Sequence, residues 1–170
     1  KGEAILNRHQ DSHDVISHME ISSDVSEMHR TPKSALELID ILKLRHGLLM
    51  AERPDKNPGE FKERPNRAGG TDFVLPELVE GTLVQGFSVY ESLPCPIKKA
   101  VFMHFLISEC HPFEDGNGRI SRIMMNADLV SAGQFKIIIP TVHRESYLGG
   151  LRAASRQNRF RSMVKVLHQL

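Results

Sequence analysis

This sequence has little of what marks several common classes of protein. It contains no tryptophan, only two cysteines in 170 residues, and a formal net charge of +1. Two cysteines cannot build the disulfide framework of a small secreted domain, and they fit a reducing compartment. A net charge so close to zero gives no whole-molecule attraction to nucleic acid or membrane. These absences exclude a disulfide-stapled scaffold and a binder driven by overall charge.

Long apolar runs are also missing. No stretch approaches the length of about 20 apolar residues that a transmembrane helix needs, and no secretory leader is recognisable. The chain begins at Lys1 rather than Met, which is consistent with a fragment of a longer protein.

What the sequence does contain is an ordinary globular composition, with 40% hydrophobic and 25% charged residues, at a length that suits one domain with a sizeable core. In the helix predicted for residues 35–50, His46 and Gly47 are expected to loosen the last turns. We predict a mainly α fold, a compact bundle of about seven helices. Apolar residues recur at helical spacing in residues 35–50, 75–87, 97–109 and 119–130.

The most informative stretch is His111 to Arg122, which reads HPFEDGNGRISR between two apolar helical patterns. Gly116 and Gly118 permit positive φ angles and close backbone approach, so consecutive N–H groups can converge on one anion. The turn leads directly into a helix, whose N-terminal amides and dipole favour phosphate. Neither a linker nor a core needs this mixture of residues. The stretch therefore predicts an anion-binding turn.

The side chains of this stretch add chemistry to the turn. Arg119 and Arg122 are three residues apart, so they are neighbours on the first helical turn, and each offers a planar fork for phosphate oxygens. Asp115 is a hard oxygen ligand suited to Mg²⁺, which usually joins one or two carboxylates to substrate phosphates. His111 titrates near neutrality and can accept a proton from an attacking hydroxyl. Together they predict metal-assisted transfer from a nucleotide.

Two neighbouring residues offer weaker alternatives. Cys110 precedes His111 and suggests a thiol nucleophile. Residues adjacent in sequence are seldom a catalytic pair, and a free cysteine is most often a small core residue, so we expect a structural thiol. His104 lies on the preceding helix and is expected to be a packed or capping histidine.

At every fixed position residues 111–122 match the signature of the Fic family, H-x-F-x-[D/E]-[G/A]-N-G-R-x-x-R, and the chain resembles that family over about residues 36–168. The resemblance implies that His111 deprotonates a target Ser, Thr or Tyr hydroxyl. It implies that Asp115 holds Mg²⁺. The phosphate-binding residues that it implies are Gly116, Asn117, Gly118, Arg119 and Arg122.

A second informative stretch runs from Gly59 to Val74. Apolar residues flank a turn at Gly69-Gly70, which predicts a short hairpin, and Pro65 favours an edge strand. An edge strand can pair with an extended peptide. The resemblance identifies this hairpin with the Fic flap, which places the target hydroxyl beside the histidine. The side chains predicted to dock the target are Phe61, Lys62, Arg64, Asn66 and Arg67.

The two ends of the chain carry less information. Residues 1–35 are predicted to be an N-terminal helical extension, and residues 36–170 the Fic domain. The tail from Arg144 onward is basic, and we expect a solvated face rather than a nucleic-acid site because no helix-turn-helix spacing is evident. The resemblance implies that Tyr147 lies near the adenine.

The predicted function is protein adenylyl transfer, in which AMP passes from ATP to a protein hydroxyl and pyrophosphate leaves. Mg²⁺ is the predicted cofactor, ATP the co-substrate, and the location a bacterial-type cytoplasm, with a secreted effector as the alternative. Transfer of phosphate or of another nucleotide monophosphate, and removal of AMP, remain open, although Gly118 favours AMP transfer in the family. A nucleotide sensor without activity is the non-enzymatic alternative, and His111 argues against it because a binding site needs no base.

Many Fic proteins carry an inhibitory helix with the pattern [S/T]-x-x-x-E-[G/N], whose Glu pairs with the second motif Arg. Glu80-Gly81 is the one Glu-Gly pair here, and Pro76 stands where the hydroxyl is required. Ser23 and Glu27 have the right spacing, but a methionine follows them. We therefore expect inhibition from a segment outside this sequence, from an antitoxin-like chain, or by another route.

Overall fold

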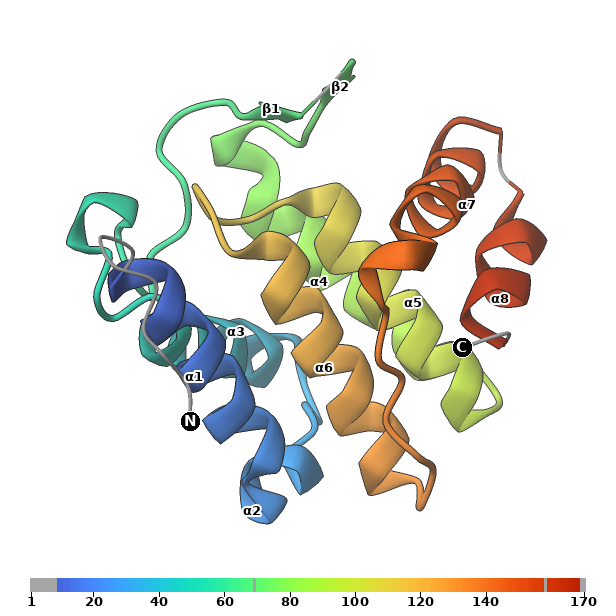
Figure 1. The fold of residues 1–170 in the computed structure, drawn as a ribbon. Helices are drawn as coiled ribbons and strands as arrows, with labels where there is room; N and C mark the ends of the chain where they lie inside the picture. Colours follow the sequence, from blue (N-terminus) through green and yellow to red (C-terminus); the bar gives the residue numbers. More distant parts are fainter. Residues whose placement is uncertain (1–8, 69, 158, 169–170) are drawn as a thin grey trace. The chain divides into compact units, whose positions relative to one another are not determined.

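Helices and one short hairpin account for nearly all of the regular structure in the computed structural model, which describes residues 9–68, 70–157 and 159–168 (Figure 1). The chain divides after Gly133 into two compact units. The helices of the first unit are α1 (His9–Ser23), α2 (Val25–His29), α3 (Ala35–Leu49), α4 (Val79–Ser92), α5 (Pro96–Cys110) and α6 (Asn117–Ser131). Two 3-10 turns, η1 (Pro54–Lys56) and η2 (Pro76–Leu78), lie in its connections.

The hairpin of the first unit consists of β1 (Arg67–Ala68) and β2 (Thr71–Asp72). The strands are antiparallel, with Arg67 opposite Asp72 and Ala68 opposite Thr71. The hairpin lies at the same end of the unit as the α5–α6 connection, which contains the motif (Figure 1). Both the mainly α architecture and the single hairpin confirm the prediction from the sequence.

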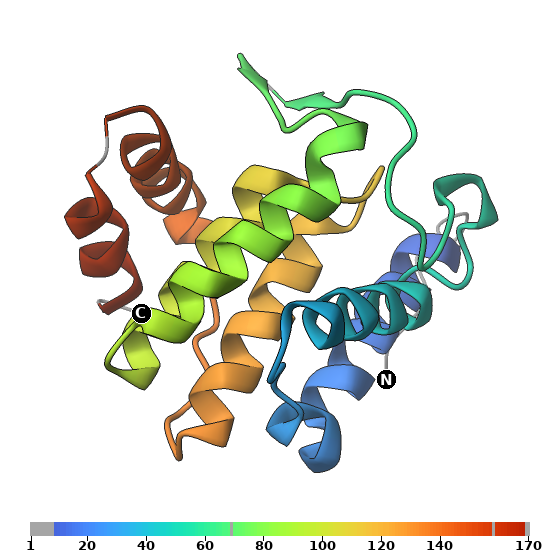
Figure 2. The same ribbon diagram turned by 180° about the vertical axis from the view of Figure 1, so that it is seen from behind.

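Helix α6 forms the centre of the first unit. It packs against α1, α2, α3 and α5. Helix α1 lies on the near face in Figure 1, and α3 and α4 lie on the near face in Figure 2. Burying each large apolar side chain of this helix contributes roughly 1.5–3 kcal/mol. Helix α6, which contains the second half of the motif, is therefore anchored in the core of the unit, and its fully buried apolar residues include Ile120, Ile123, Met124 and Ala127.

Helix α3 carries polar groups into this core. The fully buried guanidinium of Arg45 pairs with the carboxylate of Glu27 at 3.1 Å and donates to the Arg30 carbonyl at 2.8 Å, so it satisfies the end of α2. His46 is also fully buried, and α3 continues past it to Leu49. The expected loosening at His46 was therefore wrong, because its ring is packed against the motif, as described below.

The second unit contains the 3-10 turn η3 (Thr141–His143) and the helices α7 (Arg144–Gln157) and α8 (Phe160–His168). The two helices pack closely at Gly150, where an added Cβ would lie 3.1 Å from the Met163 Cα atom. The basic side chains of this unit, Arg144, Arg152, Arg156, Arg159, Arg161 and Lys165, are exposed, as predicted. Within the described residues, no helix combines the length and the apolar character needed to cross a bilayer.

The unit boundary after Gly133 differs from the predicted division between residues 35 and 36. Helices α1 and α2, which belong to the predicted extension, pack on α6 and on each other. Residues 1–8 of that extension lie outside the described residues.

Candidate active site

The motif connects α5 to α6 through a turn bounded by two left-handed residues. His111 ends α5 with φ 50° and ψ 58°, and Gly116 precedes α6 with φ 75°. A Cβ on Gly116 would lie 3.0 Å from the Met50 sulfur and 3.3 Å from His46 Nε2. Both the positive φ and this tight packing explain why glycine occupies the position. The structure thus places the predicted base at one end of the turn and the predicted phosphate site at the other.

The His111 ring is fixed by two contacts. Its Nδ1 lies 3.0 Å from the Ser108 carbonyl oxygen, and since a carbonyl only accepts, Nδ1 carries the proton and donates. The opposite nitrogen, Nε2, is then the unprotonated one. The ring stacks on Phe73 of the hairpin, with the centroids 3.7 Å apart and the planes at 6°. This geometry orients a proton acceptor at Nε2.

Burial lowers the pKa of His111 below the usual 6.5, and the charge of Lys62 lowers it further, while the Ser108 carbonyl and the Asp115 carboxylate act in the opposite direction. The imidazole is therefore neutral at neutral pH. A neutral imidazole is the form that a general base requires.

The loop itself is closed by the side chain of Asn117. Its Oδ1 accepts from the Phe113 N–H at 2.9 Å, and its Nδ2 donates to the Phe113 carbonyl at 2.8 Å. The side chain is buried and both its polar ends are used. Asn117 can therefore contribute to the predicted anion hole only through its backbone N–H.

Backbone amides at the start of α6 form the other half of that site. The amides of Arg119 and Ile120 already donate to the Gly116 carbonyl. Those of Asn117 and Gly118 lie at the open start of the helix, where intrahelical acceptors are lacking. Among the described residues, the side-chain atom that a Cβ added at Gly118 would meet is Arg122 Nη1, at 3.5 Å, which is an ordinary van der Waals distance. The arrangement is the one that favours phosphate at a helix N-terminus.

His46 supports the turn from α3 and was missed as a site residue in the sequence. Its ring stacks on Phe113 at 3.7 Å and 6°. Its Nδ1 accepts from the Gly59 N–H at 3.0 Å, so Nε2 carries the proton that is donated to the Asp115 carbonyl at 3.1 Å. Burial lowers the pKa of His46 to about 4. His46 therefore holds the turn as a neutral ring with both nitrogens occupied.

Lys62 and Asn66 connect the base of the hairpin to the motif. The buried Lys62 ammonium donates to Asn66 Oδ1 at 2.8 Å and to the Cys110 carbonyl at 3.4 Å. Asn66 Nδ2 in turn donates to the Phe113 carbonyl at 2.9 Å. Both side chains are thus joined to the motif by hydrogen bonds, and their part in docking a target remains a prediction.

The remaining flap residues divide in the same way. Phe61 packs against the Phe113 ring with the centroids 5.4 Å apart. Arg64 and Arg67 are exposed, and Arg67 pairs with Asp72 at 3.4 Å across the hairpin. Of the side chains predicted to dock a target, the two arginines are those that the structure leaves on the surface.

The carboxylate of Asp115 is fixed but accessible. Oδ1 accepts from the Gly116 N–H at 2.6 Å, and Oδ2 lies 3.7 Å from Arg119 Nη2. The side chain is 47% exposed, which leaves room for further ligands of a metal ion. Among the described residues, no three His, Cys, Asp or Glu side chains gather as a metal site. One accessible carboxylate beside a phosphate site fits Mg²⁺, which takes its other ligands from water and phosphates.

The two motif arginines have different surroundings. Arg119 Nη1 pairs with Asp14 of α1, a residue that belongs to no motif recognised in the sequence. Arg122 forms no ion pair with a carboxylate in residues 9–68, 70–157 and 159–168, whereas Arg119 pairs with Asp14 and lies near Asp115.

Cys110 and His104, which lie on α5 beside the motif, are both buried. Cys110 is buried, and burial raises the pKa of its thiol to about 12, so it is the structural thiol that was predicted. His104 is fully buried within α5, also as predicted. Tyr147 belongs to the second unit, on α7, and its expected place beside an adenine remains a prediction.

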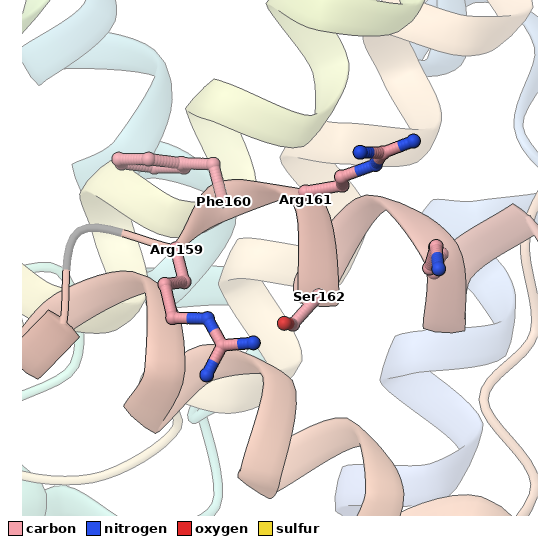
Figure 3. Close-up of a pocket in the computed structure, with 5 residues that line it drawn as sticks. Arg159, Phe160, Arg161 and Ser162 are labelled. Atoms are coloured by element: carbon pink, nitrogen blue, oxygen red, sulfur yellow. The ribbon is translucent and has the colours of Figure 1, made fainter.

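A hollow on the second unit does not coincide with the motif. Its lining is Arg159, Phe160, Arg161, Ser162 and Lys165 of the α8 region. Figure 3 shows the labelled side chains pointing apart rather than toward a common centre. The groups that converge on one place are those of the α5–α6 turn.

Comparison with known proteins identifies the family of this chain. The Fic/DOC family model matches residues 35–129, which include the hairpin and the whole motif. The chain therefore belongs to the Fic/DOC family. Curated relatives include the protein adenylyltransferase Fic of Drosophila willistoni, 32% identical over 158 residues, and that of Drosophila melanogaster, 31% identical over 163 residues. Each alignment covers 89% of this chain but only 31% and 32% of the respective relative, so the chain spans about a third of their length.

Solved structures show the same fold. A Fic domain containing signaling protein from Bacteroides thetaiotaomicron superposes with a TM-score of 0.77 at 20% identity, over 99% of this chain and 69% of that one. Fic-1 from C. elegans (residues 134–508) superposes with a TM-score of 0.73 at 21% identity, over 99% and 49%. At these identities the likeness establishes the Fic fold of this chain.

Proposed function

We propose that this chain is a protein adenylyltransferase that moves AMP from ATP to a Ser, Thr or Tyr hydroxyl of a target protein. The observation that carries the proposal is the His111 ring, whose Nδ1 is fixed to the Ser108 carbonyl while Nε2 is free to accept a proton. It stands at the head of a turn that ends in open helix amides. The relatives named protein adenylyltransferase support the same reaction.

The chemistry follows from the positions of these groups. The target hydroxyl oxygen attacks the α-phosphorus of ATP and forms the new P–O bond as its proton passes to His111 Nε2. The bond between the α-phosphorus and the bridging oxygen breaks, and pyrophosphate leaves with the electron pair. The amides of Asn117 and Gly118 and the guanidinium groups of Arg119 and Arg122 would stabilise the charge on the phosphate oxygens.

Asp115 would hold the Mg²⁺ that this reaction class uses, and the ion when bound would neutralise charge on the nucleotide phosphates. We also propose roles for the hairpin and for Tyr147. The hairpin would align the target segment, with Arg64 and Arg67 as its exposed contacts, and Tyr147 would lie against the adenine. The family domain would extend from residue 36 to the end of the chain, in a cytoplasmic protein.

Regulation is proposed to come from outside the described residues. Arg122 pairs with no carboxylate in that part of the chain, and the inhibitory pattern is not recognisable in the sequence. A further segment or a separate chain would then supply the inhibitory group. The purified chain alone is expected to be active.

The test is incubation of the purified chain with Mg²⁺ and a cell lysate, using ATP labelled at the α- or the γ-phosphate. Adenylyl transfer puts α-label but not γ-label on protein, and His111→Ala abolishes it. Label from the γ-phosphate alone would replace the proposal with phosphate transfer. ATP binding that survives in His111→Ala, with no label from either position and none from a panel of other nucleotides, would favour a sensor and overturn the enzymatic assignment.

A further inference from the structure

Helix α1 lies outside the span matched by the family model, yet it contacts the motif. The model match begins at residue 35, whereas α1 ends at Ser23. Helix α1 nevertheless packs on α6 (Figure 1). The point of contact is the ion pair between Asp14 Oδ2 and Arg119 Nη1. A residue of the N-terminal extension thus contacts an arginine that the proposed function assigns to the nucleotide phosphates.

Asp14 is held rigidly in this position. Its side chain is only 8% exposed, and its Oδ2 also accepts from Arg53 Nε at 2.9 Å. Arg53 is fixed in turn by Asp11, whose Oδ1 lies 2.6 Å from Arg53 Nη2. A buried carboxylate shared by two guanidinium groups has little freedom to leave either of them. Asp14 is therefore a fixed acceptor at the side of Arg119.

The consequence for Arg119 is a defined orientation. Asp14 takes Nη1, and the other terminal nitrogen, Nη2, lies 3.7 Å from Asp115 Oδ2. The guanidinium is thus turned so that Nη2 points to the carboxylate proposed for the metal ion. A phosphate oxygen bound there would meet a donor that is already aligned, so less side-chain freedom would be lost on binding.

The second motif arginine provides a contrast. On α1, the side chain that interacts electrostatically with Arg122 is His18. Burial lowers the pKa of His18 below 6.5, and the positive charges of Arg122 and Arg119 lower it further. Histidine is neutral or positively charged and so offers no anion. Within the described residues, α1 therefore supplies a carboxylate to Arg119 and none to Arg122.

We propose that Asp14 is a positioning residue for the nucleotide phosphates, acting through Arg119. The inference rests on the proposed function. It assigns α1 a part in the nucleotide site, although the helix precedes the matched family region. Asp14 touches no reacting atom in this arrangement and acts only by fixing the direction of Nη2.

The test compares Asp14→Asn with Asp11→Asn in the full chain. Both changes remove one carboxylate from the partners of Arg53, and both lie on α1, but only Asp14 contacts Arg119. Calorimetric titration with ATP and with adenosine separates the roles. Asp14→Asn should weaken ATP binding about tenfold and leave adenosine binding unchanged. Asp11→Asn should change neither.

A double-mutant cycle shows whether the effect passes through Arg119. In an Arg119→Ala background, Asp14→Asn should have no further effect on ATP affinity. Equal effects of Asp14→Asn on ATP and adenosine would indicate a general loosening of the fold and overturn the proposal. An undiminished effect in the Arg119→Ala background, or tighter ATP binding by Asp14→Asn, would overturn it as well.

Two further measurements keep the result interpretable. If Asp14→Asn does not fold, Asp14→Glu, which keeps the charge but displaces the carboxylate, should show the same selective loss of ATP affinity. ATP binding by the wild-type chain separates the test of the proposed function from the test of the role of Asp14. Failure of the wild-type chain to bind ATP would refute the proposed function, whereas normal wild-type binding with Asp14→Asn equal to Asp11→Asn would refute only the role of Asp14.

Discussion

Two histidine–phenylalanine stacks at the motif turn have the same ring geometry but different hydrogen bonds. His46 stacks on Phe113 from α3, and His111 stacks on Phe73 of the hairpin side. In both pairs the ring centroids are 3.7 Å apart and the planes differ by 6°. In both, burial is the largest cause that lowers the pKa of the imidazole. By stacking and by pKa alone, either could be called the base.

The difference lies in the nitrogen atoms. Both nitrogens of His46 are occupied, one by the Gly59 N–H and the other by the Asp115 carbonyl. One nitrogen of His111 is occupied by the Ser108 carbonyl, and no hydrogen bond within the described residues uses the other. A proton acceptor needs a free lone pair, so only His111 can serve as one. A lowered pKa is thus shared by a buttress and a base, and hydrogen-bond occupancy distinguishes them.

The largest expected effect is the loss of transfer in His111→Ala. General-base catalysis contributes about 10²–10⁴-fold, so the rate of AMP transfer should decrease by a factor in that range, or become undetectable. The free energy of unfolding should fall by about 1–3 kcal/mol, because the change removes one hydrogen bond to a carbonyl and one ring stack. Labelled transfer and urea unfolding on the same preparations check both parts. An active His111→Ala would remove the distinction between the two histidines.

His46→Ala should show the reverse pattern, with stability as the primary loss. The change removes a ring stack and leaves the Gly59 N–H and the Asp115 carbonyl without their partners, which should cost about 3 kcal/mol in the free energy of unfolding. The rate of AMP transfer should fall only to the extent that the α5–α6 turn becomes less ordered. Urea unfolding measures the stability, and ATP binding measures the turn. Wild-type stability in His46→Ala would mean that His46 does not support the turn.

The sequence was sufficient for the elements that local pattern determines. The motif stands between two helices as predicted, and the hairpin turns where the glycines indicate. Cys110 is a buried thiol because it lies on the same side of α5 as the buried Met103, Leu106 and Ile107, one and two turns earlier. In each case the residues that decide the structure lie within a few positions of one another.

The supports of the site could not be predicted in this way. His46 and Asp115 are 69 positions apart, and their contact depends on how α3 packs against the turn. Asp14 resembles any other acidic residue of a polar helix until α1 is placed on α6. Asn117 was expected at the anion hole, but the structure uses its side chain to close the loop. Tertiary packing decides the contacts of His46 and Asp14, and no local spacing encodes them. The two hydrogen bonds of Asn117 join it to Phe113, four positions earlier, so they are local, but the residue types alone do not distinguish them from a role at the anion hole.

A smaller effect should separate the ring stack from simple burial at His111. Phe73→Ala removes the surface on which the imidazole rests, and an aromatic pair contributes about 0.5–1.5 kcal/mol, so transfer should fall about fivefold. Phe73→Leu is the matched control, since it keeps an apolar cover without an aromatic face. It should retain more activity than Phe73→Ala. Steady-state transfer rates at saturating ATP make the comparison, and equal rates in wild type and Phe73→Ala would show that the stack does not orient the base.

The smallest effect concerns the pH profile. Because the pKa of His111 lies below 6.5, the neutral base persists as the pH falls to that value, and kcat/KM should decline only at lower pH, as the ring becomes protonated. Burial is the main cause of the lowered pKa, and the Lys62 charge adds to it. Lys62→Met should therefore move the acid limb toward higher pH, by less than about one unit.

The direction of that shift is what the experiment decides. The change also removes the hydrogen bonds of Lys62 to Asn66 and to the Cys110 carbonyl, so the rate at pH 8 will fall for structural reasons. The midpoint of the limb is independent of that loss, provided the wild type and Lys62→Met are each normalised to their own plateau. A limb that moves to lower pH in Lys62→Met would show that a group other than His111 controls the profile, and the comparison of the two histidines would have to be drawn again.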